Sequence, residues 1–128
     1  FCCISLSDLL TPWPVIENRL QAAAQGDFVV AFYNPRSQRR TEGIRQAQAI
    51  LLQHRDPTTP VAIAKNLYRE GESIHITTLG HMDPEAIDML TLVLVGNSSS
   101  LIYPSGELKQ GQPRWIITPR GYANKKPG

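Results

Sequence analysis

The sequence has no long hydrophobic run, few aromatic residues and almost no cysteine. Its apolar stretches, such as Leu92 to Val95, are far shorter than the roughly 20 residues that a membrane-spanning helix needs. No charged segment followed by a long apolar stretch stands at its start, so it shows no recognisable secretion signal. We therefore expect no membrane partner.

The cysteines and histidines show no pattern that is typical of disulfides or of a metal site. The two cysteines, Cys2 and Cys3, are adjacent and cannot form a disulfide framework, which favours a reduced, cytoplasmic setting. The three histidines, His54, His75 and His81, have no CxxC or HxxxH partner. The sequence therefore predicts no metal site.

The composition is that of one globular domain. Hydrophobic residues make up 41% of the 128 residues and charged residues 19%, without low-complexity tracts. The net charge is +2, but the segment from Phe28 to Arg55 carries five arginines against the single acid Glu42; this gives +4 there and −2 elsewhere. Such a concentration of positive charge favours an anionic partner.

Helices and strands are expected to alternate in the first half of the chain. A first helix is expected over residues 12–26, with Thr11 as its N-cap. The apolar run Phe28–Phe32 is typical of a strand that is covered on both faces. A second helix over Arg39–His54 and a second strand over Val61–Ala64 complete a βαβ unit, whose two strands should be parallel.

The second half of the chain adds four further elements. These are a polar strand over Ser73–Thr78, a short helix from Asp83 to Met89, an apolar strand over Leu90–Val95, and an edge hairpin of Leu101–Tyr103 with Trp115–Ile117. The sequence therefore predicts an α/β fold with a mixed, mostly parallel five-stranded sheet and flanking helices.

The segment that follows the first buried strand is the best candidate for chemistry. Ligands of open α/β sheets gather at the carboxyl ends of strands, beside helix N-termini. If the helix begins near Ser37, Arg36 and Arg40 lie one turn apart, with Arg39 beside them. Guanidinium groups in such a cluster suit carboxylates or phosphates. The alternative is a solvated, charged helix start.

Five tracts of the chain, taken in order, carry a family resemblance. They are Ile4–Trp13, Asp27–Arg40, Thr59–Glu72, Asp88–Ser98 and Thr118–Tyr122. Together they resemble the second domain of the precorrin-3B C(17)-methyltransferases, which are members of the tetrapyrrole methylase family. Each tract alone is a weak signal, but five in the same order cover nearly the whole chain.

This resemblance implies that the chain is the C-terminal half of the tetrapyrrole methylase fold. Residues 1–11 would be the interdomain connection, 12–122 the C-terminal domain and 123–128 a loose basic tail. Family members bind S-adenosylmethionine between two domains and methylate precorrin-3B at ring carbon 17, with ring contraction to precorrin-4, in cobalamin (vitamin B12) biosynthesis. The glycine-rich cofactor loop of their first domain has no counterpart here, so the fragment alone should be inactive.

The same resemblance implies partners and site residues. The partners would be a precorrin, the N-terminal methylase domain of the same polypeptide, and a second copy in a homodimer. The adenosyl group would be contacted by Tyr33, Asn34, Ala62, Ala64, Asn66, Leu67, Thr118 and Pro119, although core packing is the alternative role of the two alanines. The many carboxylates of a precorrin would be bound by arginines from three loops, namely Arg36, Arg39, Arg40, Arg69 and Arg120.

Other interpretations stay open at this stage. No catalytic residue can be named, since Asp88 and Glu70 are merely acids within the matching tracts. The chain could come from another precorrin methylase of the cobalamin pathway, or be a non-catalytic anion-binding, RNA-binding or dimerisation module. The pI of 8.7 and the absence of aromatic residues among the arginines argue against a nucleic-acid partner.

Overall fold

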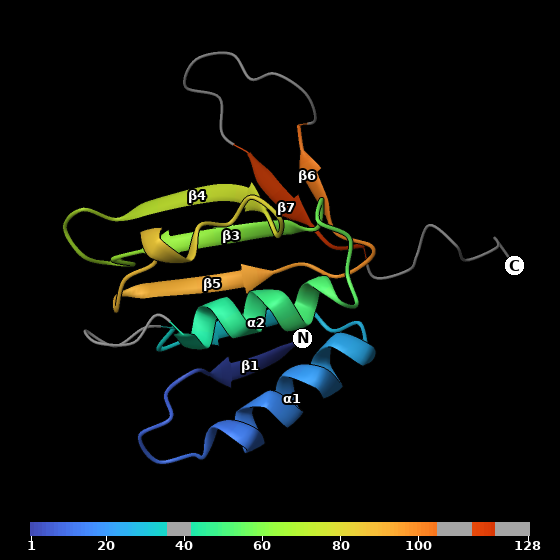
Figure 1. Ribbon diagram of the computed structural model, residues 1–128. Helices are drawn as coiled ribbons and strands as arrows, with labels where there is room; N and C mark the ends of the chain where they lie inside the picture. The colour runs from blue at the N-terminus through green and yellow to red at the C-terminus, as the bar shows by residue number, and fades with distance from the viewer. Residues whose placement is uncertain (36–41, 105–113, 120–128) are drawn as a thin grey trace, which may run out of the picture.

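Figure 1 shows the protein as a computed structural model, which describes residues 1–35, 42–104 and 114–119. A five-stranded sheet has the order β1-β2-β5-β3-β4, and a separate two-stranded sheet pairs β6 with β7. The elements are β1 (Cys2–Ser5), α1 (Trp13–Gln25), β2 (Val30–Tyr33), α2 (Glu42–Leu52), β3 (Pro60–Lys65), β4 (Ser73–Thr78), the 3-10 helix η1 (Pro84–Ala86), β5 (Thr91–Val95), β6 (Leu101–Tyr103) and β7 (Trp115–Ile117).

The five-stranded, mixed sheet with flanking helices is confirmed, but the prediction that it is mostly parallel is wrong. Only β1 and β2 pair in parallel, whereas β5 is antiparallel to both β2 and β3, and β3 is antiparallel to β4. The strands β2 and β3 do run in the same direction, as the βαβ pattern predicted, but β5 lies between them. An apolar strand does not encode its neighbours in its own sequence, so this insertion could not be foreseen.

Both helices lie over one face of the five-stranded sheet (Figure 1). Alternate residues of the inner strands, such as Val61 and Ile63 of β3 and Val93 of β5, point into the core beneath the helices. The helices add Leu20 and Leu51, both fully buried. Each such side chain contributes about 1.5–3 kcal/mol when it leaves water. The opposite face carries Ala62, Ala64, Leu92 and Leu94, all half-buried.

Several boundaries differ from the predicted ones for local reasons. The N-cap of α1 is Pro12 rather than Thr11, and no side chain caps the helix. The predicted helix over residues 83–89 is a single 3-10 turn: the Asp83 carboxylate caps its start by accepting a hydrogen bond from the Glu85 amide at 3.0 Å, and the chain is already extended again at Ile87. The strand β1 was not predicted: it lies within the segment expected to be an interdomain connection and pairs with β2.

A polar clamp joins the turn before β2 to the turn after β5. Asp27 has a positive φ of 56°, and its carboxylate accepts hydrogen bonds from the amide and the hydroxyl of Ser98, the former at 3.0 Å. The side-chain amide of Asn97 donates to the main-chain oxygen of Asp27 at 3.1 Å. These hydrogen bonds lower the pKa of the Asp27 carboxyl, because they stabilise its charged form.

Candidate functional site

A cavity of about 260 Å³ lies at the edge of the sheet where β2 and β3 end and β5 begins. It is the place where the open-sheet rule predicted a ligand. The residues that line it come from these three strands and from the loop after β3: Tyr33, Asn34, Ala64, Asn66, Leu67, Arg69, Met89, Leu90, Thr91 and Leu92.

Two asparagines shape the rim of this cavity. Asn34 and Asn66 have φ values of 49° and 51°, in the left-handed region that asparagine tolerates better than most residues. Asn34 donates from its side-chain amide to the Ser5 hydroxyl at 3.4 Å. The main-chain amide of Asn66 donates to the Leu90 oxygen at 3.1 Å, which ties the end of β3 to the start of β5.

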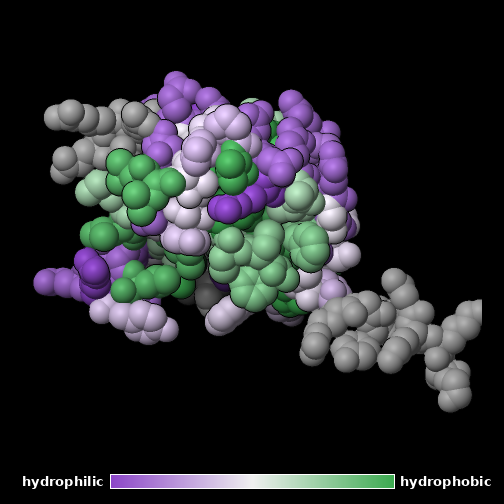
Figure 2. Space-filling model, turned by 90° about the horizontal axis from the view of Figure 1, so that it is seen from below, coloured by the Kyte–Doolittle hydropathy of each residue, from purple (hydrophilic) through white to green (hydrophobic). Residues whose placement is uncertain are grey.

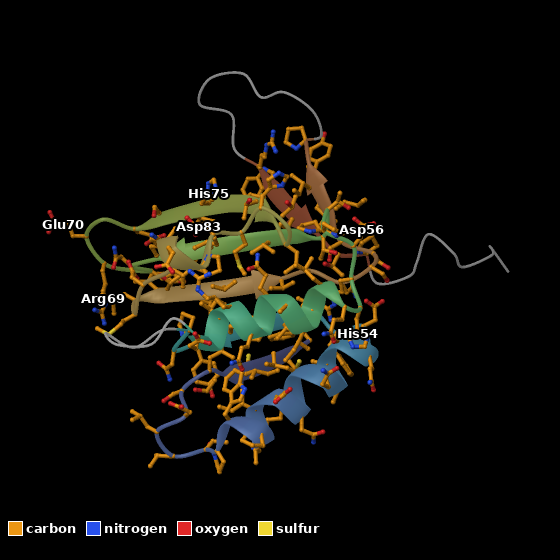
Figure 3. The ribbon with its side chains drawn as sticks, in the orientation of Figure 1. His54, Asp56, Arg69, Glu70, His75 and Asp83 are labelled. Atoms are coloured by element: carbon orange, nitrogen blue, oxygen red, sulfur yellow. The ribbon has the colours of Figure 1, made fainter. Side chains whose placement is uncertain are left out.

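The loop after β3 is a compact turn that presents Arg69. The Arg69 amide donates to the Asn66 oxygen at 2.9 Å, and the Tyr68 amide donates to the Glu72 carboxylate at 2.8 Å. Gly71, with φ of 80°, allows the chain to turn back into β4. Figure 3 shows Arg69 and Glu70 at this end of the molecule, whereas His54 and Asp56 lie at the opposite end. Arg69 thus adds a positive charge to the lining of the cavity, where an anionic ligand would meet it.

The structure brings together most of the residues expected to contact a cofactor. Five of the eight line the cavity, namely Tyr33, Asn34, Ala64, Asn66 and Leu67. Ala62 lies one residue pair earlier on β3, on the same face as Ala64 but away from the cavity lining. The Thr118 hydroxyl lies 2.6 Å from the Ser100 hydroxyl, beyond the far end of β5, and Pro119 follows it there.

The expected substrate-binding arginines are placed only in part. Arg69 lines the cavity. Arg36, Arg39, Arg40 and Arg120 lie outside the described residues, so their contacts stay predictions.

Sequence reasoning missed the contribution of β5 to the cavity. Leu92 pairs with Ala64, and Thr91 with Lys65, which brings the segment 89–92 beside the end of β3. The Asp88 carboxylate accepts hydrogen bonds from the Leu90 amide at 3.0 Å and the Thr91 hydroxyl at 2.7 Å. Asp88 therefore organises the start of β5. The one sequence signal for this part of the cavity was that Asp88 begins a tract, Asp88–Ser98, that resembles the family.

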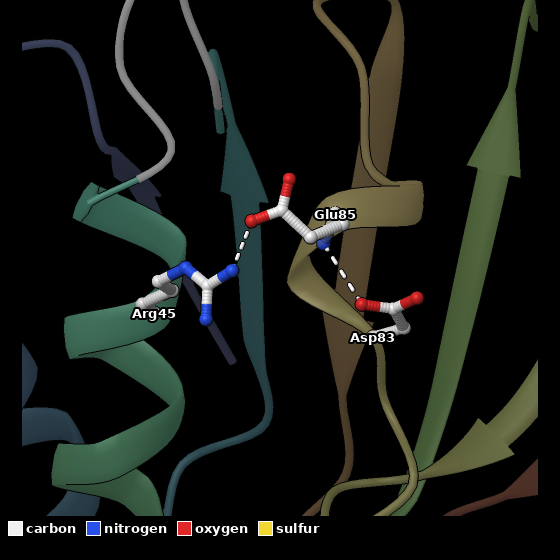
Figure 4. Close-up of polar contacts among 3 residues, drawn as sticks. All are labelled: Arg45, Asp83 and Glu85. Atoms are coloured by element: carbon white, nitrogen blue, oxygen red, sulfur yellow. Dashed lines mark hydrogen bonds and ion pairs between the residues drawn. The ribbon is translucent and has the colours of Figure 1, made fainter.

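Two arginines of the basic segment are engaged in holding the fold. Arg45 of α2 forms an ion pair with Glu85 of η1 (Figure 4). Arg55 is only 7% exposed, and its guanidinium donates to the main-chain oxygens of Gly96 at 2.7 Å, Ala23 at 3.2 Å and Phe28. Burial lowers the pKa of Arg55, while the carboxylate of Asp27 opposes this shift. Neither arginine supports the idea that the whole segment meets an anion.

Within residues 1–35, 42–104 and 114–119, no group of three His, Cys, Asp or Glu residues could hold a metal ion. No helix in this part of the chain is long and apolar enough to cross a membrane. Figure 2, seen from the side of α1, shows strongly hydrophobic side chains scattered among hydrophilic ones. The loop between β1 and α1 contains two very exposed ones, Leu9 and Leu10.

Several curated proteins of similar sequence are named as cobalt-factor III or C(17)-methyltransferases. The chain is 53% identical over 97% of its length to the cobalt-factor III methyltransferase of Priestia megaterium, and 48% identical over 95% to a probable cobalt-factor III C(17)-methyltransferase of Salmonella typhimurium. It is 39% identical over 96% to the precorrin-3B C(17)-methyltransferase of a Sinorhizobium species. The chain spans 21%, 47% and 47% of these relatives, respectively. No family model matches it.

Solved structures agree with this relationship. The crystal structure of the methyltransferase CobJ superimposes with a TM-score of 0.77 at 36% identity, over 93% of this chain and 46% of that one. A cobalt precorrin-4 methyltransferase, with a TM-score of 0.58 at 18% identity, shares the fold. The chain thus resembles in fold a part of the methyltransferase CobJ, and over nearly its whole length it is similar in sequence to a part of the cobalt-factor III and precorrin-3B C(17)-methyltransferases.

Proposed function

We propose that this chain is part of an S-adenosylmethionine-dependent C(17)-methyltransferase of cobalamin biosynthesis. The observation that carries the proposal is the similarity, over at least 95% of the chain, to proteins named for this activity. The position of the cavity agrees with it, since five residues expected to contact the adenosyl group line one space. The reaction would methylate ring carbon 17 and contract the macrocycle.

The size of the cavity supports a shared site. A volume of about 260 Å³ is below the roughly 300–1,000 Å³ of complete small-molecule pockets. The relatives are at least twice as long as the matching segment, so the remainder of such a polypeptide, including an N-terminal methylase domain, would complete the site. S-adenosylmethionine would supply an electrophilic methyl group there.

The residues of this chain would position the two reactants and would not transfer protons. The rim of the cavity presents the side-chain amides of Asn34 and Asn66 to S-adenosylmethionine. Holding the methyl donor and the tetrapyrrole in line removes much of the entropic barrier to methyl transfer. Arg69, with the arginines predicted in the segment 36–40 and at Arg120, would bind the acetate and propionate groups of the tetrapyrrole. An exposed positive charge such as that of Arg69 would orient a polycarboxylate and would not act as a base.

The tetrapyrrole substrate is precorrin-3B or its cobalt-containing counterpart. Identity is 53% and 48% to relatives named for cobalt-factor III, against 39% to one named for precorrin-3B. This ranking favours cobalt-factor III. We also propose a cytoplasmic homodimer without a nucleic-acid or membrane partner, in keeping with the sequence analysis.

The test is an assay of the whole polypeptide that contains these 128 residues. Incubation with S-adenosylmethionine and either cobalt-factor III or precorrin-3B should give a product that is heavier by one methylene unit, with the added carbon at ring position 17. Mass spectrometry and carbon-13 labelling of the donor methyl group would establish both points. Methylation at a different ring carbon would instead identify another precorrin methylase, and binding of RNA without methyl transfer would identify a nucleic-acid module.

A further inference from the structure

Tyr68 combines a strained backbone with an exposed aromatic side chain. In the described part of the chain, four residues other than glycine have a positive φ, and three of these are aspartate or asparagine, which tolerate it. The fourth is Tyr68, with φ of 60°, a conformation in which a bulky residue is an outlier. Tyr68 is also 98% exposed, so no packing of its ring within the described residues compensates for the strain.

Hydrogen bonds of the loop after β3 hold Tyr68 in this conformation. The Tyr68 amide donates to the Glu72 carboxylate at 2.8 Å. The turn around it is closed by the Arg69 amide, which donates to the Asn66 oxygen at 2.9 Å, and by the Glu72 amide, which donates to the Arg69 oxygen at 3.2 Å. The loop thus fixes the backbone of Tyr68 and leaves its ring in solvent. Strained residues that their surroundings fix in this way cluster at ligand-binding sites.

The ring of Tyr68 lies next to the proposed donor site without being part of it. Its neighbours in the chain, Leu67 and Arg69, both line the cavity of about 260 Å³, whereas Tyr68 does not. Under the proposed function this cavity holds S-adenosylmethionine, and the second reactant must approach the donor methyl group from outside. A side chain just beyond the cavity lining is therefore placed to meet the tetrapyrrole rather than the donor.

The tetrapyrrole offers a partner to each of two adjacent side chains. Its acetate and propionate groups suit the guanidinium of Arg69, and the wide conjugated face of its macrocycle suits the ring of Tyr68. Aromatic rings pack against one another in offset arrangements and remove apolar area from water. Because the loop already fixes the backbone at Tyr68, less conformational freedom is lost when a ligand binds there.

We propose that Tyr68 is a substrate-binding residue whose ring packs against the face of the tetrapyrrole macrocycle. The inference rests on the proposed function, because it assigns a contact to the tetrapyrrole of the same site. It requires that stability and binding respond with opposite signs. Replacing the tyrosine by a residue that adopts the left-handed backbone removes strain from the fold, yet it also removes the surface on which the macrocycle packs.

Tyr68→Asn in the whole polypeptide tests the proposal, because asparagine tolerates the left-handed backbone but has no ring. We expect the midpoint of urea denaturation not to fall, while the dissociation constant of cobalt-factor III, followed by its visible absorption, rises by about 10-fold or more. Tyr68→Phe keeps both the ring and the strain and should match the wild type in both measurements. The matched control is Tyr103→Asn, at a tyrosine that is 62% exposed on β6, after the end of β5 away from the cavity; it should leave the binding of cobalt-factor III unchanged.

The affinity for S-adenosylmethionine separates a direct contact from a disturbed loop. Because Asn66 and Leu67 are expected to contact the donor, a displaced loop would weaken donor binding as well, whereas loss of the ring alone should leave it unchanged. A parallel loss of donor affinity in Tyr68→Asn would therefore overturn the proposal. So would a lower urea midpoint, which would show that the ring packs against another part of the polypeptide.

The inference and the proposed function can fail separately. If the wild-type polypeptide methylates cobalt-factor III at ring carbon 17 while Tyr68→Asn binds this tetrapyrrole as tightly as the wild type, the proposed function stands and the role of Tyr68 is wrong. If the wild type neither binds nor methylates cobalt-factor III or precorrin-3B, both are wrong.

Discussion

Asn34 and Asn66 hold equivalent positions on two parallel strands and face one cavity. Each follows the last residue of its strand, β2 or β3, and each has a left-handed backbone with φ of 49° or 51°. The left-handed conformation turns the chain sharply at the edge of the sheet. The two strand ends border one cavity, and the start of β5, which lies between the two strands, also lines it.

The backbone at Asn66 predicts a specific pattern of stabilities. Asn66→Val should lower the free energy of unfolding by about 1–2 kcal/mol, because a β-branched residue is strained at positive φ. Asn66→Gly, which relieves that strain, should change it little. Urea denaturation of both variants measures the difference. Equal losses in both would show that the side-chain hydrogen bond to Gly71, at 3.4 Å, matters rather than the backbone.

The buried guanidinium of Arg55 should be a major determinant of stability. Arg55→Met removes the guanidinium donor from the oxygens of Gly96, Ala23 and Phe28. The Ala23 oxygen keeps the Phe28 amide as a donor at 3.1 Å, and each buried group that is left unsatisfied costs about 1–3 kcal/mol. We expect a total loss of about 3 kcal/mol or more in chemical denaturation. Arg19→Met, at an exposed position of α1, is the control and should be nearly neutral. Similar effects of the two substitutions would contradict this role.

The polar clamp at Asp27 predicts a dependence of stability on pH. The folded-state pKa of Asp27 lies below its ordinary value of 3.8, so the clamp contributes fully above that value and is lost as pH falls through the lower folded pKa. Asp27→Asn tolerates the same positive φ but cannot ionise. The free energy of unfolding, measured at neutral pH and near pH 3, should fall less on acidification in the variant than in the wild type. Because the carboxyl is exposed, the effect should be below about 1 kcal/mol. If both proteins lose the same free energy of unfolding on acidification, Asp27 does not contribute to the pH dependence.

Arg69 should affect the tetrapyrrole more than the methyl donor. In the whole polypeptide, Arg69→Ala should weaken tetrapyrrole binding by about one decade, since a hydrogen bond to a charged group contributes about 1.5–3 kcal/mol and exposure reduces this. The loss should shrink at high salt, where the wild-type contact is already screened. Affinity for S-adenosylmethionine, measured alone by calorimetry, should change little. Arg19→Ala is the control. An equal loss of tetrapyrrole affinity in this variant would show that the net charge of the protein, rather than the position of Arg69, determines binding.

The isolated chain should fold but bind S-adenosylmethionine only weakly. The cavity lies open at one edge of the sheet, and a micromolar dissociation constant corresponds to about 8 kcal/mol, which is too much for half a site. Calorimetric titration of the 128-residue chain, beside the whole polypeptide, tests this. Micromolar binding by the chain alone would show that its own residues form a complete donor site.

The sequence by itself determined which residues form most elements and at which end of the sheet the cavity lies. The apolar runs around Val61–Ala64 and Leu90–Val95 predicted interior strands, and Tyr33 with Asn34 was expected at the end of another, because burial on both faces requires unbroken apolar residues. The five ordered tracts identified the relatives, because they record a shared ancestry along the chain.

Only the tertiary structure decided how these pieces face one another. The insertion of β5 between β2 and β3 reversed most strand pairings and brought residues 89–92 to the cavity. Arg55 counted only as one positive charge of the basic segment in the sequence, whereas in the structure it is buried and donates to three carbonyl oxygens. The pairing of β6 with β7 likewise places Trp115 on an exposed face. Strand pairing and burial depend on contacts between residues far apart in the chain, and a local hydrophobic pattern is compatible with many such pairings.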